Sequence, residues 1–345
     1  MKKVLITGSE GFIGSNMVKY WLSHYPDDQI IRVDAFTYAA RTPMITEGQE
    51  SYTELHSLDI RNQEKIESLI ASYKPDLILH YAAESHVCKS IKDPTGITST
   101  NIGGTLNLLE SVRKHSPNTR FIHISTDEVF GQLKRGDMPF TEMSQIKPRS
   151  PYSASKAASD HLCFAYAETY GLDIVVTNSS NVFGPNQHEE KLIARTIMSV
   201  LQDKPMVLYG NGSHIRDWIY VNDHCSAIDL IAKKGKTGER YCIGGLMEYT
   251  NKEMVETIHA LFYMIYPAFD APLNIEYSND RPTDDFRYAV NPRKLMDLGW
   301  RPSCEQFALN LMNTIQFYVG ENAKKTKAVH STRSAGAVSQ FKSPL

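Results

Sequence analysis

The chain opens with the residues Lys2-Lys3-Val4-Leu5-Ile6-Thr7-Gly8-Ser9-Glu10-Gly11-Phe12-Ile13-Gly14. The apolar run predicts a short buried strand, and the residues that follow the glycines predict a helix. Glycine permits the tight turn and the close backbone approach that a pyrophosphate needs, and the pyrophosphate then lies at the positive end of the helix. The stretch therefore predicts a strand, a phosphate-binding loop and a helix, the beginning of a dinucleotide-binding fold.

A second apolar strand ends in Asp34, about 20 residues after the last of these glycines, at the spacing of a ribose-binding acid. A carboxylate there accepts hydrogen bonds from the adenosine ribose hydroxyls, and it repels the additional phosphate of NADP. Asp34 therefore favours NAD as the cofactor. The alternative is an ordinary turn residue.

Strands and helices alternate from residue 1 to about 178, which is the pattern of an α/β fold with a doubly wound parallel sheet, the Rossmann arrangement. The predicted strands are 3–7, 29–33, 54–58, 77–81, 120–125 and 173–178. The predicted helices are 15–24, 63–73, 102–115 and 152–170. We assign residues 1–180 to an NAD-binding Rossmann domain.

The pattern changes after residue 180, where glycine-rich turns separate helical stretches near 190–202, 222–234 and 251–265. Residues 181–321 are predicted to form a smaller C-terminal substrate-binding region, although the return of a later strand to the first sheet stays open. Residues 322–345 are polar and basic and lack apolar periodicity, so they predict a disordered tail.

The strand predicted over residues 120–125 runs directly into Thr126, Asp127 and Glu128. A strand of a parallel sheet delivers its last side chains to the carboxyl edge, where ligands of open α/β folds bind. Two neighbouring carboxyl groups push their pKa values apart, so one can keep its proton as a general acid while the other acts as a base. The alternative is a solvated acidic loop.

Tyr152 and Lys156 lie one helical turn apart, so both side chains emerge on the same face of a helix. An ammonium group near the phenol would lower its pKa from about 10 and make a tyrosine base accessible near neutral pH. The alternative is an ordinary helix surface.

Composition argues against several classes of protein. The chain has 345 residues and a formal net charge of −2, and no dense basic stripe precedes the C-terminal tail, so we expect no nucleic-acid partner. The first apolar run is too short for a signal peptide or a membrane span, so we expect a soluble, cytoplasmic protein with no membrane partner.

The cysteines and histidines predict no metal site and no disulfide framework. The 5 cysteines are odd in number and scattered, and they form no C-x-x-C pair, so reduced thiols are expected. The 12 histidines include no H-x-x-x-H pair that would place two imidazoles on one helical face.

The glycines are spaced as G-x-x-G-x-x-G, and in this the chain resembles the extended branch of the short-chain dehydrogenase/reductase superfamily. In that superfamily the ends of the following strands contact adenine and the nicotinamide ribose. The resemblance implies these cofactor-binding residues: Gly8, Gly11, Phe12, Ile13, Gly14, Asp34, Asp59, Ile60, Tyr81, Ala82, Ala83, Ser85, Tyr152, Lys156 and Val182.

From residue 1 to about 302 the chain resembles the nucleotide-sugar 4,6-dehydratases. The resemblance rests on Ala82-Ala83-Glu84-Ser85-His86-Val87, Ser125-Thr126-Asp127-Glu128-Val129-Phe130-Gly131, Glu190-Lys191-Leu192-Ile193, Arg216-Asp217-Trp218-Ile219-Tyr220-Val221 and Asp280-Arg281-Pro282. The run from Thr126 to Glu128 is the specific part, because related epimerases and decarboxylases usually lack this Asp-Glu pair.

The resemblance implies an NAD-dependent hydro-lyase of deoxysugar biosynthesis that converts a nucleoside-diphosphate glucose, typically dTDP-glucose, into the 4-keto-6-deoxy sugar. Tyr152 would take the 4-hydroxyl proton, with Thr126 holding the oxygen and Lys156 tuning the phenol. Glu128 would then remove the C5 proton, and Asp127 would protonate the departing C6 hydroxyl. The hydride returns to C6, so the net reaction is loss of water.

The resemblance also implies the substrate contacts. Arg216 matches a position that meets the substrate pyrophosphate, where a guanidinium makes paired hydrogen bonds; the alternative is a surface ion pair with Asp217 or Asp223. The substrate-binding residues that it implies are Ser85, His86, Thr126, Asn181, Glu190, Lys191, Leu192, Val207, Tyr209, Arg216, Asn251 and Arg281.

Three departures from the family bear on the choice of nucleotide. Bacterial members commonly read Arg-Pro-Gly-His-Asp where this chain has Arg281-Pro282-Thr283-Asp284-Asp285. Val182 stands where an asparagine is usual, and Cys88 where an aspartate is common. The uridine nucleotide of UDP-glucose therefore stays open as an alternative to thymidine.

Two alternative functions stay open, and so does the oligomeric state. An epimerase or decarboxylase would use the same Tyr152/Lys156 pair without Asp127 as an acid, and a sensor of NAD or nucleotide sugar would keep the fold without catalysis. The family is commonly homodimeric through helices that include the Tyr152 helix. Apolar residues that could serve such a bundle, or pack on the sheet, are Leu106, Leu109, Leu162 and Phe164.

Overall fold

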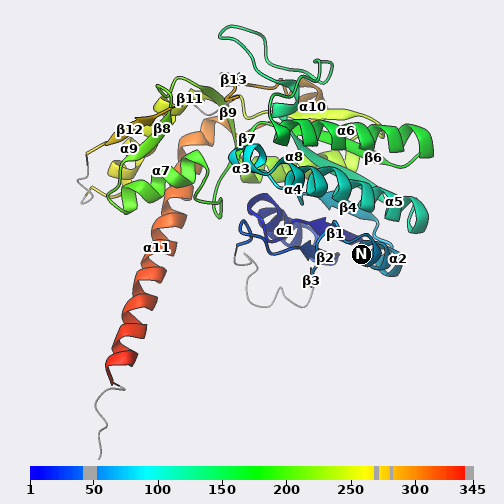
Figure 1. Cartoon of the computed structure of the whole chain (residues 1–345), viewed down its shortest axis with the longest axis horizontal. Coiled ribbons are helices and arrows are strands. Elements are labelled where there is room, and N and C mark those ends of the chain that lie inside the picture. Colours follow the sequence, from blue (N-terminus) through cyan, green and yellow to red (C-terminus); the bar gives the residue numbers. More distant parts are fainter. Residues whose placement is uncertain (42–52, 268–271, 280–282, 339–345) are drawn as a thin grey trace, which may run out of the picture.

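A computed structural model of the chain describes residues 1–41, 53–267, 272–279 and 283–338. Its largest sheet is parallel and has seven strands in the order β10-β6-β5-β4-β1-β2-β3 (Figure 1). The strands are β1 (Lys3–Thr7), β2 (Gln29–Asp34), β3 (Thr53–Ser57), β4 (Leu77–His80), β5 (Arg120–Thr126), β6 (Ile174–Ser179) and β10 (Arg240–Ile243). This order confirms the predicted doubly wound parallel sheet.

The two faces of this sheet are covered because successive side chains of a strand point to opposite faces. In β1, Val4 and Ile6 pack with helices α1 (Phe12–His24) and α8 (Val221–Lys234), whereas Leu5 packs on the other side. The helices on that other side are α2 (Gln63–Tyr73), α5 (Thr105–His115) and α6 (Pro151–Tyr170). A sheet that is buried on both faces requires the continuous apolar runs seen in the sequence.

A second region lies beside the sheet in Figure 1 and has a core of its own. Its strands are β7 (Asn181–Phe183), β8 (Met206–Tyr209), β9 (Ile215–Tyr220), β11 (Glu248–Thr250), β12 (Ile275–Ser278) and β13 (Arg287–Tyr288). Its helices are α7 (Leu192–Leu201), α9 (Asn251–Ile265) and α11 (Phe307–Val338). The two regions do not divide cleanly at residue 180, because β10 and α8 return to the first sheet.

Several parts of the structure differ from the sequence predictions. Short helices α3 (Val87–Lys92) and α4 (Pro94–Thr98) precede a π-helical turn, Ser99–Gly104, where only a later helix was expected; α10 (Arg293–Asp297) was also not predicted. The prediction of a disordered tail from residue 322 also differs, since α11 continues as a helix to Val338 and extends away from the rest of the molecule (Figure 1). Residues 322–338 contain no proline and are rich in alanine and lysine, which favour a helix even without an apolar face.

Among the residues that the structure describes, no helix is both long and apolar enough to cross a membrane.

Helix α8 carries a histidine, His224, that gives the fold a pH dependence. Its side chain is fully buried, and neither ring nitrogen has a hydrogen-bond partner among the described residues. Burial lowers the pKa of His224 from 6.5 to about 4. In the unfolded chain His224 binds a proton near pH 6.5, whereas in the folded chain it binds one only near pH 4. The folded state therefore loses stability as the pH decreases from about 6.5 to about 4.

We expect His224→Met to reduce this acid sensitivity. At ~1.4 kcal/mol per pKa unit, His224 lowers the free energy of unfolding by about 2 kcal/mol between pH 7 and pH 5. Urea unfolding at the two pH values should show a loss that is smaller by this amount in the variant. His24→Gln, at an exposed histidine of α1, is the control. Equal losses in wild type and His224→Met would contradict the prediction.

Candidate active site

A cleft of about 840 Å³ runs along the carboxyl ends of the parallel strands and continues into the second region. The predicted residues that line it are Gly8, Gly11, Phe12, Ile13, Gly14, Asp34, Asp59, Ile60, Tyr81, Ala82, Ala83, Ser85, His86, Thr126, Glu128, Tyr152, Lys156, Asn181, Val182, Glu190, Lys191, Leu192, Tyr209, Arg216 and Asn251. The strand ends thus come together in one groove, as expected of an open α/β fold.

Three predicted residues are not part of this lining. Asp127 lies just behind it and is buried. Val207 lies outside it, because its neighbours Met206 and Leu208 in β8 point into the core and the alternation of the strand turns Val207 outward. A contact of Val207 with substrate stays a prediction. Arg281 lies outside the described residues.

The glycine-rich turn between β1 and α1 is packed backbone against backbone. Gly8 has φ +67, and a Cβ atom on it would lie 2.8 Å from the Ala82 nitrogen. A Cβ on Gly14 would lie 2.0 Å from the Gly8 oxygen. Gly11, the N-cap of α1, offers no side-chain cap, so the first amide groups of the helix are left for an anion. This cradle fits the pyrophosphate of a dinucleotide.

The acidic residues at the ends of the strands fit the adenosine half of NAD. The carboxylate of Asp34 accepts hydrogen bonds from the Glu10 nitrogen (2.9 Å) and the Phe36 nitrogen (2.8 Å). These bonds fix its orientation and leave lone pairs for ribose hydroxyls. Asp59 is held by Arg61, and the side-chain hydrogen bond between them lowers the pKa of Asp59. The residues present therefore suit NAD.

We expect Gly14→Ala to weaken NAD binding at least about tenfold, a change of ~1.4 kcal/mol. The added methyl group collides with the Gly8 carbonyl and must displace the start of α1 from the phosphate position. Isothermal titration of NAD into protein freed of cofactor measures the effect. Gly103→Ala is the control, since a Cβ there meets nothing within 4 Å. Equal NAD affinity in Gly14→Ala and wild type would rule out this reading of the turn.

The predicted catalytic residues meet where β5 ends and α6 begins. The Thr126 hydroxyl donates to an Asp127 carboxylate oxygen (3.3 Å) and accepts from the Glu128 nitrogen (3.3 Å). Helix α6 begins with a capping box between Ser150 and Ser153, which fixes its first turn. That turn carries Tyr152, which is hydrogen-bonded to the side chain of Thr126.

Asp127 has the environment of a carboxylic acid that stays protonated. Only 2% of its surface is exposed, and its Oδ2 has no hydrogen-bond partner among the described residues. Burial raises its pKa well above the usual value, and the nearby carboxylates of Glu128 and Asp217 add to the rise, against the opposing effect of Arg216. This direction agrees with the prediction that one of the two neighbouring carboxyl groups keeps its proton.

The prediction that Lys156 lowers the pKa of Tyr152 is wrong for the protein alone. Burial raises the pKa of Tyr152, and the Glu128 carboxylate raises it further. The Lys156 ammonium is itself buried, and it donates to the Ile124 carbonyl (2.9 Å). The sequence does not show how deeply this turn is buried, and burial is the dominant effect.

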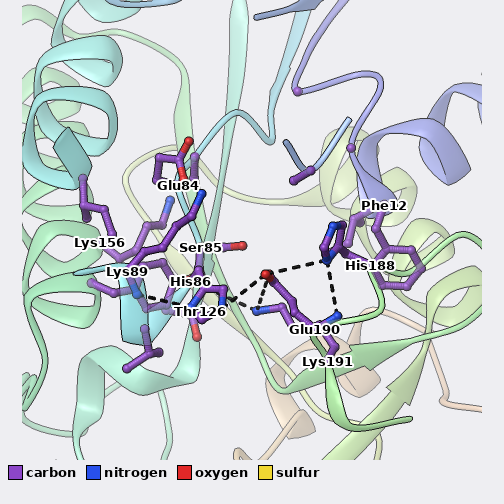
Figure 2. Close-up of a pocket in the computed structure, with 18 of the residues that line it drawn as sticks. Phe12, Glu84, Ser85, His86, Lys89, Thr126, Lys156, His188, Glu190 and Lys191 are labelled. Atoms are coloured by element: carbon purple, nitrogen blue, oxygen red, sulfur yellow. Dashed lines mark hydrogen bonds and ion pairs between the residues drawn. The ribbon is translucent and has the colours of Figure 1, made fainter. Parts of the chain in front are cut away.

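Glu190 connects the two walls of the cleft (Figure 2). Its carboxylate lies 3.2 Å from the His86 ring, 3.6 Å from the His188 ring and 3.9 Å from the Lys191 ammonium. The Lys191 ammonium also donates to the Ser85 carbonyl (3.3 Å). These contacts join the loop after β4 to the segment that leads into α7.

Several lining residues were not predicted from the sequence. Tyr288 is buried against the cleft, with the Arg216 guanidinium 4.5 Å from its ring centre, and Glu128 is among the groups that raise its pKa. It belongs to β13, a strand of two residues, which is too short to give a periodic signal. Figure 2 also shows Glu84, Lys89 and His188 at the cleft. Glu84 stands in the run Ala82–Val87 but was given no role there, and Lys89 and His188 stand in no motif that would have singled them out.

Comparisons with known proteins agree with this geometry. The family model described as GDP-mannose 4,6 dehydratase matches residues 5–309. The dTDP-glucose 4,6-dehydratase of Haemophilus influenzae is 41% identical over 336 residues, which cover 92% of this chain and 98% of the relative.

Two solved structures are similar along most of the chain. The dTDP-glucose 4,6-dehydratase of Bacillus anthracis in complex with NAD has a TM-score of 0.83 and 38% identity, and the match covers 93% of this chain and 97% of that one. DesIV, the dTDP-glucose 4,6-dehydratase of Streptomyces venezuelae with NAD and TYD bound, has a TM-score of 0.84 and 36% identity, with 93% and 98% covered. With this fold, this cleft and these relatives, the chain belongs to the nucleotide-sugar 4,6-dehydratase family.

Proposed function

We propose that the protein is a hydro-lyase that converts dTDP-glucose into dTDP-4-keto-6-deoxyglucose. The observation that carries the proposal is the pair Asp127 and Glu128 beside Tyr152 at one end of a dinucleotide cleft. A dehydrogenase or epimerase needs the tyrosine, but only elimination of water needs a proton donor for the leaving hydroxyl as well as a base for the neighbouring carbon.

When bound in the glycine-rich cradle, NAD supplies the acceptor for the C4 hydride and the donor that returns it to C6. Tyr152 takes the proton of the 4-hydroxyl, and Thr126, hydrogen-bonded to Tyr152, holds the same oxygen. Lys156, whose ammonium donates to the Ile124 carbonyl, would hold the nicotinamide ribose of NAD.

The resulting ketone acidifies C5, and the two carboxyl groups complete the elimination. Glu128, which lines the cleft, removes the C5 proton, and protonated Asp127 gives its proton to the C6 hydroxyl, which leaves as water. Glu128 then returns its proton to C5. Tyr152 has then gained one proton and Asp127 has lost one, and transfer of a proton from Tyr152 to Asp127 through solvent restores both groups.

The test is incubation of the purified protein with dTDP-glucose and, separately, UDP-glucose, without added reductant. Mass spectrometry should show the loss of one water from dTDP-glucose. The thymidine nucleotide is proposed because the relatives named above act on dTDP-glucose. Water loss from UDP-glucose alone would overturn the nucleotide, and an isomer or a decarboxylated product without water loss would overturn the reaction.

We also propose that the protein is a cytoplasmic homodimer that pairs through α5 and α6. All five cysteines are free thiols, as in a reducing compartment. Leu162 and Phe164 are only partly buried by the chain itself, as expected of residues at a helical interface, whereas Leu109 is buried within the core. Sedimentation equilibrium should give twice the 39.0 kDa chain mass, and a monomer would refute the dimer.

A further inference from the structure

Arg216 projects into the cleft already paired with a carboxylate. Its Nη2 lies 3.2 Å from Asp284 Oδ1, and only 8% and 6% of the two side chains are exposed. Its Nη1 donates to the Ile215 carbonyl (2.8 Å) and to the Phe286 carbonyl (3.4 Å). The guanidinium is therefore held in place by the backbone, and Asp284 is its anionic partner.

The proposed function requires the diphosphate of the substrate to lie in the part of the cleft that the second region lines. The cationic side chains that line this part, among the described residues, are Lys191, Arg195 and Arg216. The Lys191 side chain is 40% exposed and lies beside Glu190, whereas Arg216 is buried. A charge-assisted bond to phosphate is least screened by solvent at the buried guanidinium. Arg216 is thus the most buried of these three cations, and we take it as the diphosphate site.

Phosphate and carboxylate compete for the same face of a guanidinium, since both accept its paired N–H donors. Two anions side by side at a buried site repel each other strongly. We propose that Asp284 is an internal competitor that the diphosphate of the substrate must displace from Arg216, and that it thereby sets the affinity for nucleotide. This inference rests on the proposed function, because it assumes a nucleoside-diphosphate ligand.

The residues that follow Asp284 are held by contacts that do not involve the Asp284 side chain. The carboxylate of Asp285 pairs with Arg149 (2.5 Å) and binds the Tyr288 hydroxyl. The Arg287 guanidinium pairs with Glu248 (2.5 Å). The Asp284 side chain can consequently leave Arg216 while β13 stays in register with β9.

The residue before Asp284 is strained in the paired state. Thr283 has φ +59, in the left-handed region that a β-branched residue rarely occupies. Glycine adopts this conformation without penalty, whereas threonine does not. The strain lies next to the ion pair, so a movement of Asp284 that relieved it would offset part of the cost of breaking the pair.

Isothermal titration of dTDP and of UDP into the NAD-loaded protein tests the proposal. Asp284→Asn keeps the size of the side chain and removes its charge, so the dissociation constant for dTDP should decrease about tenfold. Asp284→Glu keeps the charge and should show no such gain. Asp297→Asn is the control for the loss of one acidic group, since Asp297 is 58% exposed on α10 and is not part of the cleft lining.

An unchanged or weaker affinity of Asp284→Asn for dTDP would overturn the inference. If that variant does not fold, Asp284→Ala, which also removes the charge, should give the same tightening. A crystal structure of the wild-type dTDP complex supplies a second readout: Asp284 should lie beyond roughly 4 Å of Arg216, and an intact pair would refute displacement. Failure of the wild type to bind either diphosphate would instead overturn the proposed function, and this inference with it.

Discussion

Asp127→Asn is expected to lower the rate of water loss from dTDP-glucose by about 10²- to 10⁴-fold, the usual contribution of a positioned general acid. The amide has nearly the shape of the carboxylic acid but cannot give a proton to the departing hydroxyl. Removal of the 4-hydroxyl proton by Tyr152 does not depend on this proton. Oxidation at C4 should therefore continue while elimination stalls, and absorbance from reduced nicotinamide should accumulate.

The measurement combines stopped-flow absorbance with mass spectrometry of the sugar. Asp137→Asn is the matched control, because Asp137 is exposed in a loop outside the cleft lining and caps the Lys134 nitrogen. Ordinary water loss by Asp127→Asn would show that another group protonates the leaving hydroxyl. It would also revive the epimerase and decarboxylase alternatives.

Tyr152→Phe should reduce turnover by a similar factor, about 10²- to 10⁴-fold, but at an earlier step. Without the phenol the 4-hydroxyl loses the base that takes its proton, so C4 is not oxidised. No reduced nicotinamide should accumulate, which separates this variant from Asp127→Asn. The raised pKa of Tyr152 in the protein alone also implies that the base forms only when bound ligands offset the burial.

Tyr166→Phe is the control for this variant. Tyr166 lies on the same helix, and its hydroxyl donates to Glu110 (2.6 Å) outside the cleft lining. It should retain the wild-type rate. A Tyr152→Phe protein that reduces its nicotinamide at the wild-type rate would exclude Tyr152 as the base.

The first half of the fold could be predicted from the sequence because its strands are buried on both faces. The run Val4–Ile6 and the glycines that follow it specify β1 and the turn without help from distant residues. In the second half, β7, β11 and β13 have two or three residues each and exist through their pairing with β9 or its neighbours. Short strands of this kind carry no periodic signal of their own.

In the site, too, residues on long strands could be predicted from the sequence and residues placed by tertiary packing could not. Residues at the ends of long strands, such as Thr126 and Asp34, were predicted because the sheet itself brings strand ends to one edge. Asp284 and Tyr288 reach the cleft from the far end of the chain, and only tertiary packing places them there. The pKa of Tyr152 was predicted in the wrong direction because depth of burial cannot be read from the spacing of Tyr152 and Lys156.

The return of β10 to the central sheet has a consequence for biosynthesis. β10 pairs with β6, and its Arg240 lies 3.4 Å from Asp160, which is fully buried beneath the nucleotide cleft. Until Arg240 has left the ribosome, this carboxylate lacks its arginine partner and β6 presents an open edge. About sixty residues separate the end of β6 from the start of β10. During synthesis the first six strands therefore stay without the last strand of their sheet until these residues have been added.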